Sequence, residues 1–296
     1  MIEIQELTKS FGSAGIRDVS FTCTPGTVTG FLGPNGAGKS TTMRLLCGLN
    51  AADAGSATID GVPYRRLPQP GRRVGVMLDP TAMHAGRSGH ETLSLSAAVL
   101  GVGNARVAEV LDLVGLDKGA AAKRVGIYSL GMRQRLALGM ALLGDPGILV
   151  LDEPANGLDP QGIHWMRVLL RDYADRGGTV LLSSHLLHEV QAVADKLVII
   201  NLGRIVANGT PEELQGTRTT LVRSLDQALL AAALKAAEQP FTSASDGSLR
   251  VEATTEQVGR IAASSGSVLT ELREQGEDLE ELFLSLTANN AQEVAA

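Results

Sequence analysis

A glycine-rich segment near the start of the chain has the residue types and spacing needed to hold phosphate groups. It reads Gly33-Pro34-Asn35-Gly36-Ala37-Gly38-Lys39-Ser40 and matches the pattern GxxxxGK(S/T). The glycines allow a tight turn whose N–H groups point at phosphate oxygens, and a following helix adds its positive dipole end. We expect Lys39 to neutralise the β- and γ-phosphates, Ser40 to bind Mg²⁺ and Thr41 to complete the nucleotide-binding set. The alternative is a glycine-rich loop with only a structural role.

Two adjacent carboxylates, Asp152 and Glu153, follow the wholly apolar run Ile148–Leu151. Such a run is typical of a strand inside a parallel sheet, and ligands bind at the carboxyl edge of such sheets. Because successive strand residues point to opposite sides, we predict different roles for the two carboxylates. Asp152 is suited to hold Mg²⁺, usually through water, and Glu153 to act as general base or to position the attacking water. Alone, the pair could be a solvated strand end; beside a phosphate site, it predicts ATP hydrolysis.

The elements that position these groups follow from an alternation of short β-rich runs and helix-length segments, which predicts an α/β domain. The phosphate segment lies between a predicted strand and a helix that begins near Lys39. The predicted strands are Ile2–Leu7, Val19–Thr24, Thr27–Phe31, Val74–Leu78, Ile148–Leu151, Thr179–Ser183, Leu197–Ile200 and Ile205–Ala207. The stretch from Leu78 to Ile148 is too long for one crossover helix. Apolar spacing predicts helices over Ala105–Leu116 and Leu130–Leu143, so we expect an inserted helical subdomain at about residues 84–143.

The sequence pattern changes near Pro211–Gly216, and we predict a domain boundary there. Residues 1–216 would form the nucleotide-binding domain, and residues 217–296 a small acidic α+β domain. In this second part we expect a helix over Leu225–Ala237, short strands around Ser248–Ala253 and a final helix at Leu279–Thr287.

Composition and charge restrict the function further. The 296 residues are 44% hydrophobic and 20% charged, as in an ordinary globular protein. No apolar run approaches the roughly 20 residues needed to cross a bilayer, and Met1–Ile4 has no signal-peptide features. Residues 217–296 carry 6 Lys/Arg and 12 Asp/Glu, which accounts for the net charge of −6. Without a basic surface we expect no nucleic-acid partner, and we expect Cys23 and Cys47 to be free core thiols in a reducing cytoplasm.

Four further features resemble the ABC ATPase family. The segment Tyr128–Arg135 reads YSLGMRQR and resembles the signature LSGGQ with its trailing xQR, at the start of a predicted helix. Asn156–Asp159 resembles the D-loop of the family, and Ser183-Ser184-His185 resembles its switch histidine. Phe11 stands where the family has an aromatic residue that stacks on adenine. The resemblance covers roughly residues 1–215 and implies a P-loop NTPase fold of the ABC ATPase type, α/β with a mixed sheet core.

The resemblance implies roles for these residues, each with an alternative. Ser129 and Gly131 would contact the ATP bound to a second copy, although Ser129 could be a helix N-cap or serve both roles. His185 would bond to the γ-phosphate, although a single histidine is often structural. Phe11 could be a core residue instead. His185 and His188 form an H-x-x-H pair, but no third ligand stands nearby, which does not favour a metal site.

The sequence departs from the family at two places. Leu130 and Met132 stand where LSGGQ has a Gly and the Gln, which could weaken dimerisation or make it asymmetric. After the fourth predicted strand the family usually has a Gln that touches Mg²⁺ and senses the membrane partner. Here the position is Asp79, followed by Pro80, and Asp79 is either a substitute Mg²⁺ ligand or a turn residue. The segment His84–Thr92 is then expected where the family docks its membrane subunit.

By resemblance, two such domains pair head to tail and trap two ATP molecules. Each ATP would lie between Lys39, Ser40 and Asp152 of one copy and Ser129 of the other. Closure would move a separate membrane permease, and hydrolysis assisted by Glu153 would let the pair reopen. One set of motifs per chain requires a dimer, either with a second copy of this chain or with a related ATPase.

The sequence around Asn156–Pro160 and the acidic C-terminal part resemble bacterial export ATPases, including drug and antibiotic exporters. We therefore favour export over import, and a cytoplasmic protein held at the inner face of the cell membrane by its permease. One alternative is an ABC ATPase of translation or DNA repair, but such proteins usually carry two motif sets or long coiled coils. Another is a regulatory module that binds ATP without turnover, which the altered signature permits.

Overall fold

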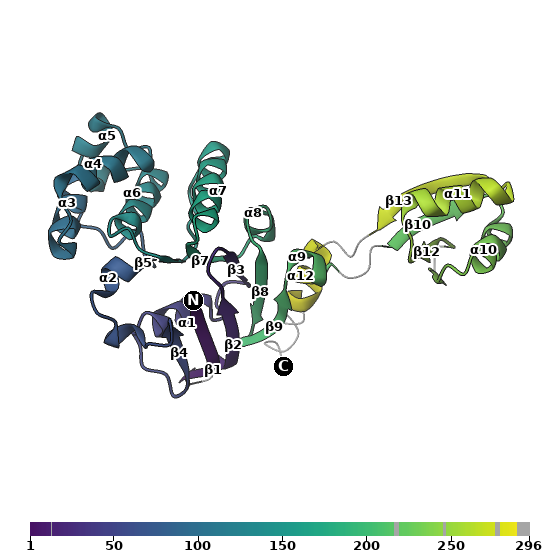
Figure 1. Cartoon of the computed structure of the whole chain (residues 1–296), viewed down its shortest axis with the longest axis horizontal. Coiled ribbons are helices and arrows are strands. Elements are labelled where there is room, and N and C mark those ends of the chain that lie inside the picture. The colour runs from purple at the N-terminus through teal and green to yellow at the C-terminus, as the bar shows by residue number, and fades with distance from the viewer. Residues whose placement is uncertain (13, 216–218, 245–246, 276–278, 289–296) are drawn as a thin grey trace. The chain divides into compact units, whose positions relative to one another are not determined.

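The strands that follow the sequence prediction most closely form a six-stranded sheet in the order β5-β6-β7-β3-β8-β9. Its members are β3 (Val28–Leu32), β5 (Val74–Met77), β6 (Ile148–Leu151), β7 (Thr179–Ser184), β8 (Lys196–Asn201) and β9 (Arg204–Gly209) (Figure 1). All neighbours in this sheet are parallel except β8 and β9. The carboxyl ends of the parallel strands therefore share one edge, which is where open α/β sheets bind ligands. The mixed sheet confirms the predicted fold class.

The computed structural model describes residues 1–12, 14–215, 219–244, 247–275 and 279–288. By their contacts these residues form two units: one contains Met1–Pro211 and the described residues from Leu286 onward, and the other contains Glu212–Ser285. The boundary predicted between residues 216 and 217 lies outside the described residues. None of the helices in the described ranges has the length and apolar character needed to span a membrane.

A second, antiparallel sheet has three strands in the order β2-β1-β4. They are β1 (Ile2–Phe11), β2 (Ala14–Cys23) and β4 (Ala54–Ile59), and β1 is four residues longer than predicted. The sequence analysis missed β4. Within this strand only Ile59 is buried, so it has no alternating apolar pattern, and its pairing with β1 is what defines it.

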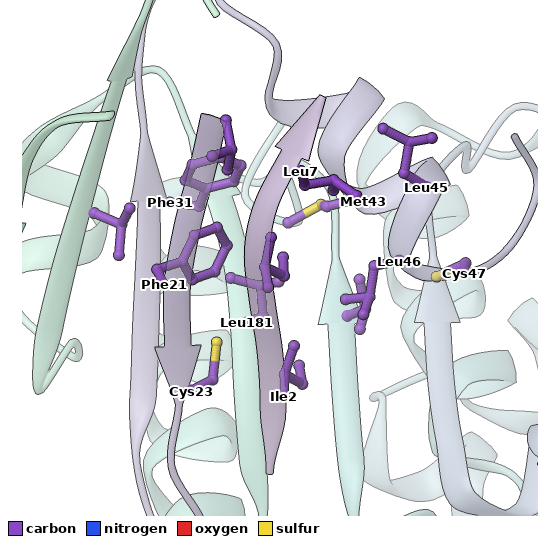
Figure 2. Packing of buried hydrophobic residues seen from close by; sticks show 14 of the residues in the cluster. Ile2, Leu7, Phe21, Cys23, Phe31, Met43, Leu45, Leu46, Cys47 and Leu181 are labelled. Carbon is purple, nitrogen blue, oxygen red and sulfur yellow. The ribbon is translucent and has the colours of Figure 1, made fainter. Parts of the chain in front are cut away.

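The core of the first unit lies between these sheets and helix α1 (Lys39–Leu46), as Figure 2 shows. Phe21 of the small sheet and Phe31 of the large sheet meet with ring centroids 5.1 Å apart. Met43 and Leu46 of α1 belong to the same buried cluster. Because α1 is anchored by these side chains, its first turn is held at a fixed place beside the end of β3.

Both cysteine thiols are expected to be unreactive in the folded protein. Cys23 and Cys47 are free and buried, and burial raises the pKa of each thiol to about 12. At pH 8 only about 10⁻⁴ of each thiol would be thiolate, the form that reacts with disulfide reagents. Titration with a chromogenic disulfide should therefore detect almost no thiol at pH 8 in buffer and two per chain in guanidinium. Rapid reaction of either thiol in buffer would contradict the buried placement.

Between β5 and β6 the chain forms a group of helices that contact one another, visible together in Figure 1. The longest are α3 (Gly89–Leu100), α4 (Asn104–Leu113) and α6 (Leu130–Leu142), with the short α2 (Pro70–Arg73) and α5 (Lys118–Ala122) beside them. The sequence analysis did not predict α3, which begins with a capping box between Ser88 and Glu91. The helix predicted over Ala105–Leu116 ends at Leu113, before Gly115 with φ of 68°. The next helices after β6 are α7 (Pro160–Asp175), α8 (Leu187–Gln191) and α9 (Pro211–Leu214).

The second unit contains an antiparallel four-stranded sheet in the order β11-β12-β10-β13. Its elements are β10 (Thr219–Ser224), α10 (Gln227–Ala236), β11 (Phe241–Ser243), β12 (Leu249–Val251), α11 (Thr255–Ser265) and β13 (Leu269–Gln275). Helices α10 and α11 share a buried cluster with the sheet, which includes Leu230, Val258 and Val222. The last helix, α12 (Leu279–Ala288), follows β13. The helix predicted over Leu225–Ala237 corresponds to α10, whereas α11 and β13 were not predicted.

Candidate functional site

The glycine-rich segment forms the loop that joins β3 to the N-terminus of α1. Gly38 is the N-cap of α1 and has φ of 115°, and the helix start has no side-chain cap. A Cβ on Gly38 would lie 2.5 Å from the Ile16 side chain, and one on Gly33 would lie 2.3 Å from the Ile200 carbonyl oxygen. The first N–H groups of a helix have no partner within it, and here no side chain caps them. This start of α1 therefore fits a phosphate group.

The side chains of the loop are distributed as a phosphate cradle requires. Asn35 and Ser40 are exposed, Pro34 and Thr41 are half-buried and Ala37 is buried. The small buried side chain of Ala37 packs inward, whereas the polar groups remain accessible to a ligand.

Lys39 is buried within the loop, with only 5% of its surface exposed. Its Nζ donates to the carbonyl oxygens of Gly33 at 2.7 Å and Pro34 at 3.3 Å. The same Nζ lies 3.2 Å from Glu153 Oε1. A buried ammonium group needs such partners, because an uncompensated buried charge is costly. The positive charge is thus held inside the loop, between its carbonyl oxygens and the Glu153 carboxylate.

The two carboxylates stand at the carboxyl end of β6, with Asp152 buried and Glu153 half-buried. Asp152 N–H donates to the Met77 carbonyl at 2.7 Å, which ties this point to the neighbouring strand β5. Glu153 Oε2 lies 2.8 Å from His185 Nδ1, while Oε1 faces Lys39. The structure thus brings Lys39, Glu153 and His185, which are far apart in the sequence, into one chain of contacts.

The donor set that could hold Mg²⁺ is small. Asp152 supplies a buried carboxylate and Ser40 an exposed hydroxyl on the first turn of α1. Mg²⁺ usually takes only one or two protein oxygens and completes its shell with water and substrate phosphates. The residues present therefore fit this metal together with a nucleotide.

Asp79 follows β5 and is exposed. Its Oδ1 accepts from Thr81 Oγ1 at 2.6 Å and from Thr81 N–H at 2.8 Å, and these bonds lower the pKa of the carboxyl. The Asp79 carbonyl oxygen accepts from Ala82 N–H at 3.3 Å. This is the arrangement of a turn-initiating Asp, so the turn interpretation is confirmed. A role for Asp79 as a Mg²⁺ ligand stays a prediction.

Ser129 is the N-cap of α6, and its Oγ accepts from Met132 N–H at 3.2 Å. The N-cap interpretation is therefore confirmed. Gly131 lies in the first turn, close to the D-loop segment, since a Cβ on it would be 3.0 Å from the Gly157 carbonyl oxygen. Contact of Ser129 and Gly131 with the nucleotide of a second copy stays a prediction.

Phe11 ends β1 and has 49% of its surface exposed, so the alternative that placed it in the core is wrong. The end of a hairpin strand carries few inward contacts, which is why burial does not follow from its hydrophobicity alone. Lys9 Nζ lies 5.7 Å from the centroid of the ring. An exposed ring is free to stack on a base, and that role stays a prediction.

Two side chains in the site lie in segments quoted in the sequence analysis but were given no role of their own there. Ser183, at 0% exposure in β7, donates from Oγ to Asp152 Oδ1 and accepts from Glu153 N–H at 2.9 Å. Gln134 of α6 is buried and donates from Nε2 to the Glu153 carbonyl oxygen at 3.2 Å. Ser183 stands in the segment that leads to His185, and Gln134 stands in the trailing xQR of the signature-like segment, but the sequence shows no individual role for either.

A family model described as "ABC transporter" matches residues 16–156. The uncharacterized ABC transporter ATP-binding protein YhcH of Bacillus subtilis (strain 168) is 40% identical over 210 residues, which are 70% of this chain and 68% of that protein. The chain belongs to the ABC transporter family. It is an ABC transporter ATP-binding protein, and its first unit has the ATPase fold of that family.

Further relatives of this ABC transporter protein are similar over the same part. The lantibiotic transport ATP-binding protein SrtF of Streptococcus pyogenes is 37% identical over 70% of this chain and 89% of its own length. The Nod factor export ATP-binding protein I of Paraburkholderia xenovorans (strain LB400) is 38% identical over 72% of each chain. A solved ATP-binding subunit of an ABC transporter has a TM-score of 0.66 at 27% identity, covering 73% of this chain and 92% of that one. Residues 218–280 match a model described as a domain of unknown function (DUF8746).

Proposed function

We propose that this ABC ATPase hydrolyses ATP at the loop of residues 33–40 and that the reaction drives export through a separate membrane permease. The observation that supports this most directly is the position of Glu153. Its carboxylate lies between Lys39 at 3.2 Å and His185 at 2.8 Å. The group suited to be the general base thus stands beside the groups suited to hold the γ-phosphate.

Each residue then has a distinct task. Lys39 and the free N–H groups of α1 hold the phosphates, and Lys39 exchanges its carbonyl partners for phosphate oxygens. Glu153 accepts a proton from the attacking water or orients it, and His185 bonds to the γ-phosphate. Asp152 and Ser40 would hold Mg²⁺, which supplies positive charge to the phosphates. Phe11 would stack on the adenine.

A second ATPase and a permease complete the proposed assembly at the inner face of the cell membrane. Ser129 and Gly131 would face the ATP of the partner ATPase, which is a second copy or a related chain. Export is favoured because relatives are named for lantibiotic transport and Nod factor export. Within the chain, residues 1–216 would be the ATPase domain, with its helical subdomain at about 84–143, and 217–296 an accessory domain.

The permease would dock on the segment His84–Thr92 and the start of α3. Gly86, Arg87, Glu91 and Leu95 line an open hollow there. Leu95 is 45% exposed, and Val99, one turn further along α3, is 88% exposed. Large exposed apolar side chains beside a charged rim are typical of protein–protein contacts.

The proposal is tested by ATP turnover of the purified chain with and without Mg²⁺. We expect slow hydrolysis that falls at least about 100-fold in a chelator and returns on addition of Mg²⁺, because Mg²⁺ supplies charge neutralisation that the protein lacks. Phosphate release would be measured at saturating ATP, and binding by a fluorescent ATP analogue. Binding without turnover, also after reconstitution with a permease, would favour the regulatory module instead. Stimulation by RNA or DNA would favour a role in translation or repair.

A further inference from the structure

The backbone of Glu153 has an unusual conformation. Its φ is 49°, in the left-handed region that residues other than glycine rarely adopt. The regular pairing of β6 ends at Leu151, two residues earlier, and Asn156 N–H closes a turn onto the Glu153 carbonyl oxygen at 3.2 Å. A conformation of this kind persists only where its surroundings hold it, and it is common at functional sites.

The hydroxyl of Ser183 binds the backbone N–H of Glu153. Ser183 Oγ accepts from Glu153 N–H at 2.9 Å and donates its own proton to Asp152 Oδ1. The direction is fixed, because the N–H can only donate and an ionised carboxylate can only accept. Ser183 is fully buried, so water does not substitute for it without rearrangement. A single side chain thus links the predicted Mg²⁺ ligand to the backbone of the predicted base.

A second side chain binds the backbone carbonyl oxygen of Glu153. Gln134 donates from Nε2 to the Glu153 carbonyl oxygen at 3.2 Å and is 3% exposed. It belongs to α6, the helix that Ser129 caps, whereas Ser183 belongs to β7, the strand that leads to His185. Both polar groups of the Glu153 backbone are therefore bonded to side chains from two different elements. Together α6 and β7 determine the direction in which the Glu153 side chain extends from the backbone.

We propose that Ser183 is a positioning residue for ATP hydrolysis, which holds Glu153 in its left-handed conformation so that the carboxylate stays between Lys39 and His185, with Gln134 supporting it from α6. The inference rests on the proposed role of Glu153. Loss of the hydroxyl lets the Glu153 backbone relax and moves the carboxylate. Lys39 and the N–H groups of the loop of residues 33–40 keep their positions, so ATP binding is preserved while ATP hydrolysis slows.

The test compares Ser183→Ala with Ser183→Thr, which keeps the hydroxyl. We expect Ser183→Ala to lower kcat about 10- to 100-fold, the effect of misplacing a reacting group by about 1 Å, with KM and the Kd of a fluorescent ATP analogue within about twofold of wild type. Ser183→Thr should recover most of the turnover. The matched control is Thr179→Ala, which removes a buried hydroxyl from the same side of the same strand. We expect it to lower the Tm but not kcat.

A second variant keeps the test decisive if Ser183→Ala folds poorly. Gln134→Leu should show the same loss in kcat at unchanged ATP affinity, because it removes the hydrogen bond to the Glu153 carbonyl oxygen and so also frees the Glu153 backbone. Equal kcat for Ser183→Ala, Thr179→Ala and wild type would overturn the inference. So would a parallel loss of kcat and ATP affinity, which indicates general damage. Absence of turnover in wild type, also after reconstitution with a permease, would instead refute the proposed function.

Discussion

Glu153→Gln is expected to lower the kcat of ATP hydrolysis by about 10²–10⁴-fold, the typical contribution of general-base assistance. The amide has nearly the same size as the carboxylate and still reaches Lys39 and His185, which lie 3.2 and 2.8 Å from the Glu153 oxygens. It cannot accept the proton of the attacking water, so the chemical step fails while ATP binding remains. Phosphate release at saturating ATP measures the loss, and gel filtration with ATP should show an accumulating dimer.

The control for this variant is Glu109→Gln, which removes an exposed carboxylate on α4 that pairs with Arg106 at 3.3 Å. An exposed pair of this kind contributes little, so we expect turnover and stability close to wild type. If Glu153→Gln retained more than about a tenth of wild-type kcat, proton abstraction would depend on another group, and Glu153 would only orient water. If it lost ATP affinity to the same degree as kcat, its role would lie in binding.

Much of the six-stranded sheet could be predicted from the sequence because its strands carry strong local signals. Ile148–Leu151 and Thr179–Ser184 are runs of buried residues, and β3 leads directly into the glycine-rich loop. In contrast, half of the residues of β4 are exposed and only Ile59 in this strand is buried, and the strand forms through pairing with β1. Helix α3 was missed for another reason: its large apolar residues are mixed with small and polar ones, so they give no clear helical period.

The site could be predicted only as a set of residues, not as a set of contacts. The pattern around Lys39 and the pair Asp152 and Glu153 indicates phosphate chemistry because residue type and spacing carry it. The bond from Ser183 to Asp152 spans 31 residues, and its geometry depends on the register of β6 with β7. The left-handed φ of Glu153 has no signal in the sequence, since glutamate rarely adopts it.

Burial decides the interpretation of residues whose type allows more than one role. Phe11 is hydrophobic yet half exposed, and Lys39 is charged yet buried among carbonyl oxygens. Ser129 combines a cap with an exposed position at a helix start, so its cap role does not exclude contact with a ligand. The preferences of single residue types could not predict whether these side chains are buried. The burial of each one depends on which helices and strands end beside it.

Lys39→Met is expected to weaken ATP binding by about 10- to 150-fold. Charge-assisted hydrogen bonds contribute about 1.5–3 kcal/mol each, and Lys39 would lose its bonds to the phosphate oxygens. Methionine keeps the length of the apolar stem, so the buried site stays filled while the charge is removed. Titration with a fluorescent ATP analogue measures the Kd directly, and turnover should fall below detection at ATP concentrations that saturate wild type.

The control for this prediction is Lys118→Met, which removes an exposed lysine from the first turn of α5 and should leave the Kd within about twofold of wild type. The comparison with Glu153→Gln then distinguishes the contribution of Lys39 to ATP binding from the contribution of Glu153 to hydrolysis. Glu153 and Lys39 lie 3.2 Å apart, yet one substitution should stop turnover with ATP bound and the other should prevent binding. If Lys39→Met bound ATP as tightly as wild type, the phosphates would be held mainly by the N–H groups of α1, and the lysine would serve the reaction by neutralising charge that develops during hydrolysis.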